Sequence, residues 1–381
     1  MHVKHNFIPF LIVIALLSSC SQPPANDNGI DRYTLEEKGI LNLELDSLSG
    51  DSPSNLYVYQ QNGTEYLVKG NFSNWRLDIY NLTSQKLYKT IPFEKEGPNG
   101  VGNSPTGFYF HNLDSIFLFF NLSQRICLVN DSGVLLNNIG PLNTINRYTY
   151  PDISAERYPF LKDNELHLST YGHKYKENQQ SGMIINLVTE LGKQPHKLTD
   201  IYSKGYWGGV LYDVYYHDYN RKEDLIIQSY GADHQIYTID DMGTKKAHMA
   251  KGERLNEKIR PYSDLDQDFM SVAQHLYKFE ALQGGYGQIR YDPYRDVYYR
   301  FVFNPVNPSE FHSPSQIWEN PSIIILNKKF SKIGEFPLPK ANKFFFMFIS
   351  KAGLNIFNTK QFEKTEEKLP FTTFELVKDE H

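Results

Sequence analysis

Five segments of the chain share one pattern: a β-rich run, a short polar turn and a second β-rich run. They begin at residues 76, 124, 182, 234 and 321 of the 381-residue chain. Three intervals between them are 48, 58 and 52 residues long, and the last is 87. Each segment is predicted to be a β-hairpin, because aromatic and β-branched residues favour strands and polar residues favour the turn. This regular recurrence constrains the fold more than any single motif.

Two further strand-like runs precede each hairpin, as at residues 107–110 and 115–120 before the second one. Four strands in a unit of about 40 to 60 residues are typical of a propeller blade. A sixth unit, which lacks one strand, is built from residues 343–349, 354–357 and 371–377. The run 40–45 can supply the missing strand and protect the edges of both terminal sheets. We therefore predict an all-β fold, a six-bladed β-propeller closed by an N-terminal strand, with a pair of packed β-sandwich domains as the alternative.

The long interval before the fifth hairpin contains the one helical pattern. Apolar residues recur at helical spacing behind Ser263, a candidate N-cap. These residues are Leu265, Phe269, Val272, Leu276 and Phe279. The pattern predicts an inserted amphipathic helix over about residues 264–282. The apolar stripe packs against its own protein or, alternatively, docks a partner.

The N-terminus has the features of a bacterial export signal. Lys4 precedes an apolar run from Phe7 to Leu17, which is too short for a bilayer crossing of about 20 residues but suits a signal peptide. The following Ser-Ser-Cys20 resembles the lipobox of bacterial lipoproteins, which implies that Cys20 carries lipid and starts the mature chain. An ordinary secretory leader cut just before this cysteine is the alternative. The lipobox implies a lipid-anchored envelope protein in the outer membrane, on its periplasmic or its surface side.

Polar residues from Ser21 to about Arg32 predict a flexible tether behind the anchor. The predicted boundaries are 1–19 for the signal peptide, 20–37 for the lipid anchor and tether, and 38–381 for the propeller domain. The formal charge of −5, or −6 once Lys4 is removed, selects no partner and argues against nucleic acid. Cys127 is then the one remaining cysteine, so no intrachain disulfide can form, and its apolar neighbours predict that it is buried.

A run rich in Tyr and Arg carries a resemblance to a known family. The segment Tyr291-Asp-Pro-Tyr-Arg-Asp-Val-Tyr-Tyr-Arg-Phe301, behind a lipobox and blade-like hairpins, resembles a lipoprotein family of Bacteroidetes, the domain of unknown function 4221. The turn Glu96-Gly-Pro-Asn-Gly100 is similar to turns between blades of related six-bladed propeller lipoproteins. The resemblance covers most of the mature chain. It implies a propeller-like fold and an envelope location, but no activity and no catalytic residue.

The usual motifs of metal and hydrolase sites are absent from the sequence. It contains no H-x-H, H-E-x-x-H or C-x-x-C pattern and no G-x-S-x-G elbow. The acidic triplet in residues 264–268 resembles the start of a calcium loop, but Phe269 occupies the glycine position and His275 the glutamate position. We interpret the triplet as a solvated helix start. Neither a metal nor another cofactor is predicted.

The strongest candidates for ligand binding are arginines and aromatic residues. The principal group is Arg290, Tyr294, Arg295 and Arg300, with Tyr206, Trp207, His217, Tyr230, His234, His312 and Trp318 as looser companions. Arginine binds carboxylates and phosphates through paired hydrogen bonds, and aromatic faces stack on sugars or peptides. An axial funnel lined by these residues would suit an anionic or glycan ligand. The alternative is structural, because a strand with an aromatic core face and a salt-bridged face shows the same alternation.

We expect a non-catalytic, membrane-tethered binding module for a protein, peptide or glycan of the cell envelope. The alternative function is a propeller-fold hydrolase or lyase that acts on polysaccharide. Such an enzyme would need converging carboxylates or a metal at the axial funnel. Fold class does not separate the two, since propellers host both.

Overall fold

The computed structural model describes residues 31–50, 53, 55–140, 149–151, 153–172, 182–189, 192–193, 215–260, 269–365 and 367–380. Residues 32–381 form one compact unit. The predicted signal peptide, Cys20 and most of the predicted tether lie outside the described residues. Tyr206, Trp207 and the acidic triplet at 264–268 lie outside them as well.

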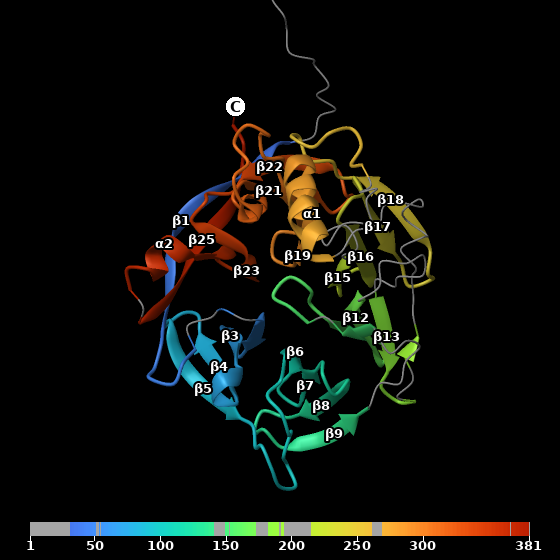
Figure 1. The fold of residues 1–381 in the computed structure, drawn as a ribbon. Helices are drawn as coiled ribbons and strands as arrows, with labels where there is room; N and C mark the ends of the chain where they lie inside the picture. The colour runs from blue at the N-terminus through green and yellow to red at the C-terminus, as the bar shows by residue number, and fades with distance from the viewer. Residues whose placement is uncertain are drawn as a thin grey trace, which may run out of the picture. The chain divides into compact units, whose positions relative to one another are not determined.

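Six antiparallel sheets surround a common axis (Figure 1), so the predicted six-bladed β-propeller is confirmed. Blade 1 contains β2 (Leu56–Gln61), β3 (Thr64–Asn71), β4 (Arg76–Asn81) and β5 (Lys86–Pro92). Blade 2 contains β6 (Gly107–Asn112), β7 (Ser115–Phe120), β8 (Arg125–Val129) and β9 (Leu135–Ile139). Blade 3 contains β10 (Thr149–Pro151), β11 (Phe160–Lys162), β12 (Glu165–Gly172), β13 (Gly182–Asn186) and β14 (Gly192–Lys193).

The second half of the chain continues the same arrangement. Blade 4 contains β15 (Tyr215–Asn220), β16 (Leu225–Tyr230), β17 (Gln235–Ile239) and β18 (Lys245–Met249). Blade 5 contains β19 (Gly285–Asp292), β20 (Val297–Phe303), β21 (Pro321–Asn327) and β22 (Lys332–Pro337). Blade 6 contains β23 (Asn342–Ser350), β24 (Gly353–Asn358), β25 (Lys368–Lys378) and β1 (Tyr33–Glu44). The first strand of a blade lies near the axis and the last at the rim, as β6 and β9 show in Figure 1.

The five predicted hairpins are the two outer strands of blades 1 to 5. Each turn begins with an Asn or Asp whose side chain accepts a hydrogen bond from a main-chain N–H two to four residues later. These residues are Asn81, Asn130, Asn186, Asp240 and Asn327. Such side chains favour a turn over a continued strand. A local sequence signal for the outer turn is therefore present once in each of these five blades.

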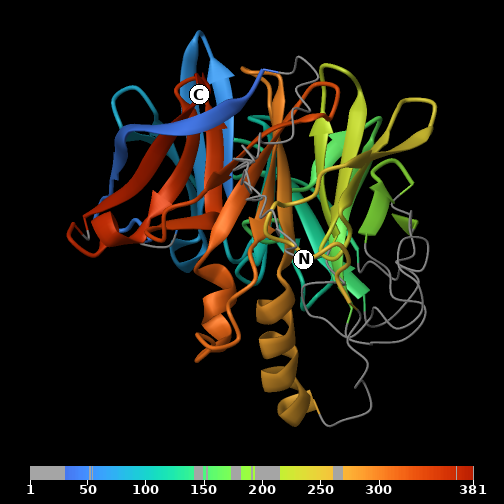
Figure 2. The same cartoon turned by 90° about the horizontal axis from the view of Figure 1, so that it is seen from above.

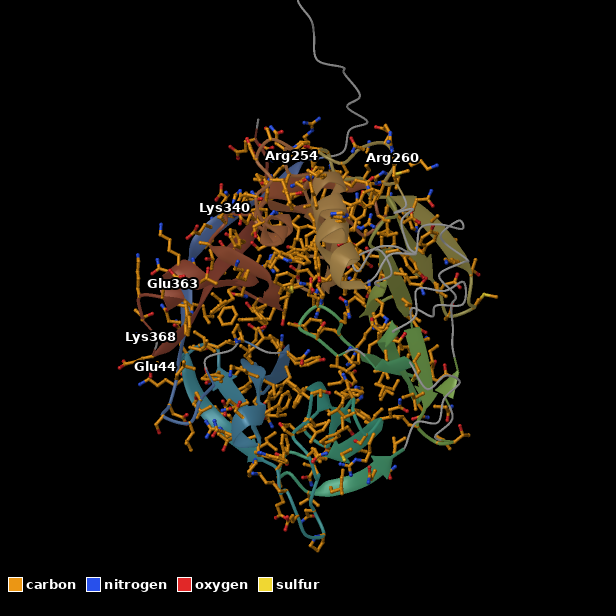
Figure 3. All side chains as sticks on the ribbon, viewed as in Figure 1. Glu44, Arg254, Arg260, Lys340, Glu363 and Lys368 are labelled. Carbon is orange, nitrogen blue, oxygen red and sulfur yellow. The ribbon has the colours of Figure 1, made fainter. Side chains whose placement is uncertain are left out.

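Strand β1 closes the ring, as predicted, by pairing with β25 from Tyr33↔Lys378 to Glu44↔Lys368. The strand begins earlier than the predicted domain boundary at residue 38. Its first half is polar because it lies at the solvent-exposed rim, where Lys38 forms ion pairs with Glu36 and Glu375, both at 3.1 Å. Figure 3 shows Glu44 and Lys368 together at this rim. Charged side chains of this kind protect an outer edge from pairing with another chain.

The predicted helix is present as α1 (Phe269–Gln283), and its predicted start lies outside the described residues. Leu276 is buried, and Phe279 packs against the largest apolar cluster. Figure 2 shows α1 projecting from one face of the ring, which we call the helical face. The short helix η3 (Pro314–Trp318) contacts α1 there. Two other short helices, η1 (Phe72–Asn74) and α2 (Thr359–Phe362), connect strands.

Apolar side chains fill the seams between blades. Three clusters join blade 1 to blade 2, blade 2 to blade 3, and blade 6 to blade 1, and one larger cluster runs through blades 4, 5 and 6. Cys127 lies fully buried in the first of these seams, as predicted. Each fully buried aromatic or aliphatic side chain contributes roughly 1.5–3 kcal/mol to the stability of the folded state. Within the described ranges, no helix has both the length and the apolar character needed to cross a bilayer.

Candidate functional site

The four principal candidate residues occupy three separate places in blade 5 and do not form one cluster. Arg300 lies inside β20, Tyr294 and Arg295 lie in the β19–β20 turn, and Arg290 lies on β19 beside the axis. Strand alternation and the turn separate side chains that are close in sequence. Each place has its own partners.

Arg300 is fully buried in the seam between blades 4 and 5. Its guanidinium donates to five main-chain carbonyls at 2.6–3.4 Å, those of Tyr230, Asp233, His234, Gln235 and Ala250. Its Nε donates to Ser229 Oγ at 3.1 Å, and its Cζ lies 3.5 Å from the centre of the Tyr286 ring. These contacts hold the β16–β17 turn of blade 4 against blade 5. The structural alternative therefore describes Arg300 better than ligand contact does.

His234 lies in the turn that Arg300 holds, and it is half-buried. Its Nδ1 is 2.6 Å from the Tyr286 hydroxyl, which also accepts a hydrogen bond from Gly252 N at 3.2 Å. Burial, and then the charge of Arg300, lower the pKa of His234 below its ordinary value. A neutral imidazole in this seam is better suited to bridging blades than to binding an anion.

The turn after β19 joins blade 5 to blades 6 and 1. Arg295 donates to Asp292 Oδ2 at 3.0 Å and to the carbonyls of Ser350 and Lys351 in blade 6 at 3.3 and 2.8 Å. Asp292 is fully buried and also accepts from the main-chain N–H of Tyr294 and Arg295. Since the carboxylate fixes the turn, Arg295 is held in one orientation.

Tyr294 extends from this turn to blade 1. Its hydroxyl donates to Glu65 Oε1 at 2.5 Å and accepts from Gln60 Nε2 at 2.9 Å. Glu65 also accepts from Lys351 N of blade 6 at 3.1 Å. Burial, followed by the hydrogen bond to Glu65, raises the pKa of Tyr294 well above its ordinary value. We call Glu65, Tyr294, Arg295 and Lys351 the turn latch.

Other polar contacts connect further blades on the same face of the propeller as the turn latch. Lys222 of blade 4 pairs with Asp296 of blade 5 at 2.9 Å, and Lys162 of blade 3 pairs with Asp224 of blade 4. Arg221 of blade 4 reaches the Tyr109 hydroxyl of blade 2 at 3.1 Å. This face, opposite the helical face, is therefore connected by polar contacts between the inner strands and turns of neighbouring blades.

Arg290 faces the axis, as the ligand hypothesis requires, but it has partners there. Its Nε is 3.4 Å from Asp218 Oδ2 of blade 4. Its guanidinium lies 3.6 Å from the centre of the Tyr158 ring. Asp218 Oδ2 also accepts from Tyr291 N at 2.7 Å. Arg290 thus combines an ion pair between blades with a cation–π contact.

Tyr158 belongs to a segment that lies in the middle of the ring. Residues 153–159, which we call the axial plug, precede β11 and are part of the green loop that reaches toward the centre in Figure 1. Tyr158 donates to Met347 O of blade 6 at 3.2 Å, and its carbonyl is 2.9 Å from His217 Nε2 of blade 4. Its ring packs edge-on against Tyr57 of blade 1, with ring centres 5.2 Å apart. Sequence reasoning missed this segment, because it has neither a hairpin nor a known motif.

The axial plug also carries a buried acid. The Glu156 Oε1 atom is buried and forms no hydrogen bond in the described part of the chain, although the residue keeps some exposed surface. Burial raises the pKa of Glu156 to about 8. A carboxyl group with this pKa is largely protonated at neutral pH. Perturbed acids of this kind are found at functional sites more often than elsewhere.

The remaining candidates lie apart from one another. His217 is buried against the axial plug, Tyr230 is buried under Arg300, and His312 is exposed near η3. Trp318 ends η3 and is half-buried, with its ring 4.8 Å from that of Phe303 and 4.9 Å from that of Phe345. Among the described residues, no three His, Cys, Asp or Glu side chains are arranged to hold a metal ion.

A sequence profile of the domain of unknown function 4221 matches residues 32–337. The chain belongs to this family. A crystal structure of a family member from Bacteroides vulgatus is similar to this chain with a TM-score of 0.76 and 22% identity, over 92% of this chain and 99% of that one. The Tyr/Arg run that suggested the family is therefore, in this member, the β19–β20 hairpin with its turn latch.

A second similar structure is that of a candidate exported protein from Bacteroides fragilis. Its TM-score is 0.56 and its identity 11%, over 94% of this chain and 98% of that one. At these identities the two structures support the fold alone. A search of curated proteins found no match.

Proposed function

We propose that this family member is an exported, lipid-anchored propeller that binds an envelope protein, peptide or glycan through its helical face. The observation that supports this surface is a group of partly exposed aromatic rings beside α1. Phe311, Trp318 and Phe345 are each only partly buried against the core. Lys278 of α1 lies 5.8 Å from the Phe311 ring. Aromatic rings beside a polar group are the usual means of holding sugars and peptides.

The turn latch makes the opposite face a weaker candidate. There Tyr294 and Arg295 hold neighbouring blades together, so a ligand would compete with those contacts. In the described part of the chain, the Trp318 side chain makes no hydrogen bond that connects one blade to another. Its indole packs against Phe303 and Phe345 but is only partly buried, so part of the indole surface is open to a ligand.

Binding is tested with the purified full-length chain on arrays of envelope glycans and peptides, compared with Trp318→Ala. The expected result is specific binding to one ligand class and at least tenfold weaker binding by the variant, which corresponds to about 1.4 kcal/mol. Tyr88→Ala is the matched control, because Tyr88 is an exposed aromatic residue on the outer strand β5. Binding by Trp318→Ala that equals the wild type would exclude this surface.

Lipid anchoring is tested separately with Cys20→Ala. The variant is expected to leave the membrane fraction while keeping the wild-type melting temperature, because the lipid alone holds the domain at the membrane. An extracytoplasmic location is part of this proposal, and one structure of similar fold is that of a candidate exported protein. A processed variant that stays in the membrane at wild-type level would disprove lipid anchoring at this residue.

One observation favours the alternative of a polysaccharide hydrolase or lyase. Glu156, with its raised pKa, has the protonation state of a general acid at neutral pH. A glycoside hydrolase also uses a second carboxylate, and Asp218, which contacts the axial arginine Arg290, is already bound to Arg290 and Tyr291 N. Release of reducing ends from polysaccharide by the wild type, abolished in Glu156→Gln, would establish the alternative.

A further inference from the structure

The axial plug connects the inner strands of several blades through hydrogen bonds, aromatic packing and one cation–π contact. Asn55 of blade 1 donates to Ser154 O at 2.7 Å, and Ile153 packs where Gly107 of blade 2 has no side chain. Tyr158 contacts blades 1, 4, 5 and 6, as described above. A change in the position of the plug would therefore alter the centre of the ring and five of its six blades.

Glu156 stands out in this segment, because its buried Oε1 has no hydrogen-bond partner in the described ranges. Among the described residues, the titratable and charged groups around the plug come from four inner strands and from the plug itself. They are Tyr57 on β2, Tyr109 on β6, His217 and Asp218 on β15, Arg290 on β19, and Arg157 and Tyr158 of the plug. Strand β23 contributes the Met347 carbonyl. Asp218 and Arg290 pair with each other, and burial is the cause of the raised pKa of Glu156.

We propose that the axial plug is a proton-controlled gate, which stays closed over the axis while Glu156 is protonated and opens more readily once Glu156 is ionised. A protonated carboxyl is tolerated in a buried site, whereas a carboxylate without a partner is strongly disfavoured there. Opening of the plug would bring Glu156 to water. The gate would act in this way whether or not the helical face binds a ligand.

The direction of the pH effect follows from the two states. In the closed state the pKa of Glu156 is about 8, and its ordinary value, expected in the open state, is 4.5. Between these values the closed plug holds a proton that the open plug has released, so rising pH favours opening. The opening equilibrium should increase about tenfold per pH unit across this interval. Below the lower value and above the upper one, it should not depend on pH.

Amide hydrogen exchange of the full-length chain measures this opening. Two protected amides report on the plug: Arg157 N donates to Ser154 O, and Leu161 N donates to the Tyr109 hydroxyl, both at 3.2 Å. After correction for the intrinsic exchange rate, their protection should fall about tenfold per unit from pH 5.5 to 7.5. Protection that stays constant over this range in the wild type would by itself overturn the proposal.

The variant Glu156→Gln removes the ionisation while keeping the shape of the side chain. Its two reporter amides should keep the same protection throughout the range. Glu363→Gln is the matched control, because Glu363 is exposed on the outer side of blade 6, and it should retain the wild-type slope. A pH slope that persists in Glu156→Gln would assign the effect to another group, such as His217, and refute the gate.

Discussion

Arg300 and Arg295 lie five residues apart on one hairpin, yet they connect blade 5 to its neighbours in different ways. Arg300 is completely buried and donates to five carbonyls of blade 4. Arg295 is partly exposed in the turn latch and donates to two carbonyls of blade 6 and to Asp292. The comparison shows that the position of an arginine along a hairpin decides its role. In the middle of a strand it stabilises the buried core, and in the turn it connects blades at the surface near the axis.

The largest effect is expected for Arg300→Ala. Loss of the guanidinium leaves several buried carbonyls without donors and an empty space beside the Tyr286 ring, so unfolding should require about 3–5 kcal/mol less. Equilibrium unfolding in urea measures this loss. Arg300→Lys should recover only part of it, because an ammonium group has fewer donors and no planar face. A loss below about 1 kcal/mol in the alanine variant would show that the buried seam is no stronger than the turn latch.

Arg295→Ala should have an intermediate effect. The buried Asp292 would lose its cation but keep hydrogen bonds from Tyr294 N, Arg295 N and the Tyr299 hydroxyl. We expect a loss of about 1–3 kcal/mol, since the site is partly solvated. Thermal unfolding of this variant beside Arg300→Ala tests the order of the two. An Arg295→Ala variant less stable than Arg300→Ala would reverse the comparison.

Tyr294→Phe should have the smallest effect on stability. It removes the hydroxyl contacts to Glu65 and Gln60 at an exposed site, which corresponds to a loss of about 0.5–1 kcal/mol. Glu65 keeps its hydrogen bond from Lys351 N. A calorimetric melting curve is the measurement, with Tyr88→Phe as control on an exposed outer strand. A loss as large as that of Arg300→Ala would mean that the turn latch carries the ring.

Sequence patterns predicted the blades because each blade repeats local signals. The alternating pattern of the strands and the Asn or Asp at the start of the outer turn in blades 1 to 5 depend only on neighbouring residues. The closing strand was predicted through Leu41 and Leu43, but its start was placed late, since the charged residues Glu36, Glu37 and Lys38 interrupt the apolar pattern of the strand. A strand at the outer rim is held by hydrogen bonds to the neighbouring strand and buries few side chains. Because it needs few apolar residues, its sequence lacks the alternating apolar pattern that predicts a strand.

The candidate site was only partly accessible to sequence reasoning. The Arg/Tyr run was singled out as unusual. Whether one of its arginines contacts a ligand or a main-chain carbonyl depends on which residues of the neighbouring blade pack against it. Arg290 lies on β19 and contacts Tyr158, whereas Arg300 lies on the neighbouring strand β20 and contacts Tyr286. Neither contact has a signature in the sequence around the arginine.

The sequence by itself determined the number of blades, because the strands and turns of each blade rest on interactions between near neighbours, and the run 40–45 marked the strand that closes the ring. Only the tertiary structure decided what occupies the axis and which face is latched. Tyr158 meets Met347 across 189 positions, and Tyr294 meets Glu65 across 229. Contacts this distant form only after the ring has closed, so the burial of Glu156 and the roles of the arginines are properties of the assembled propeller.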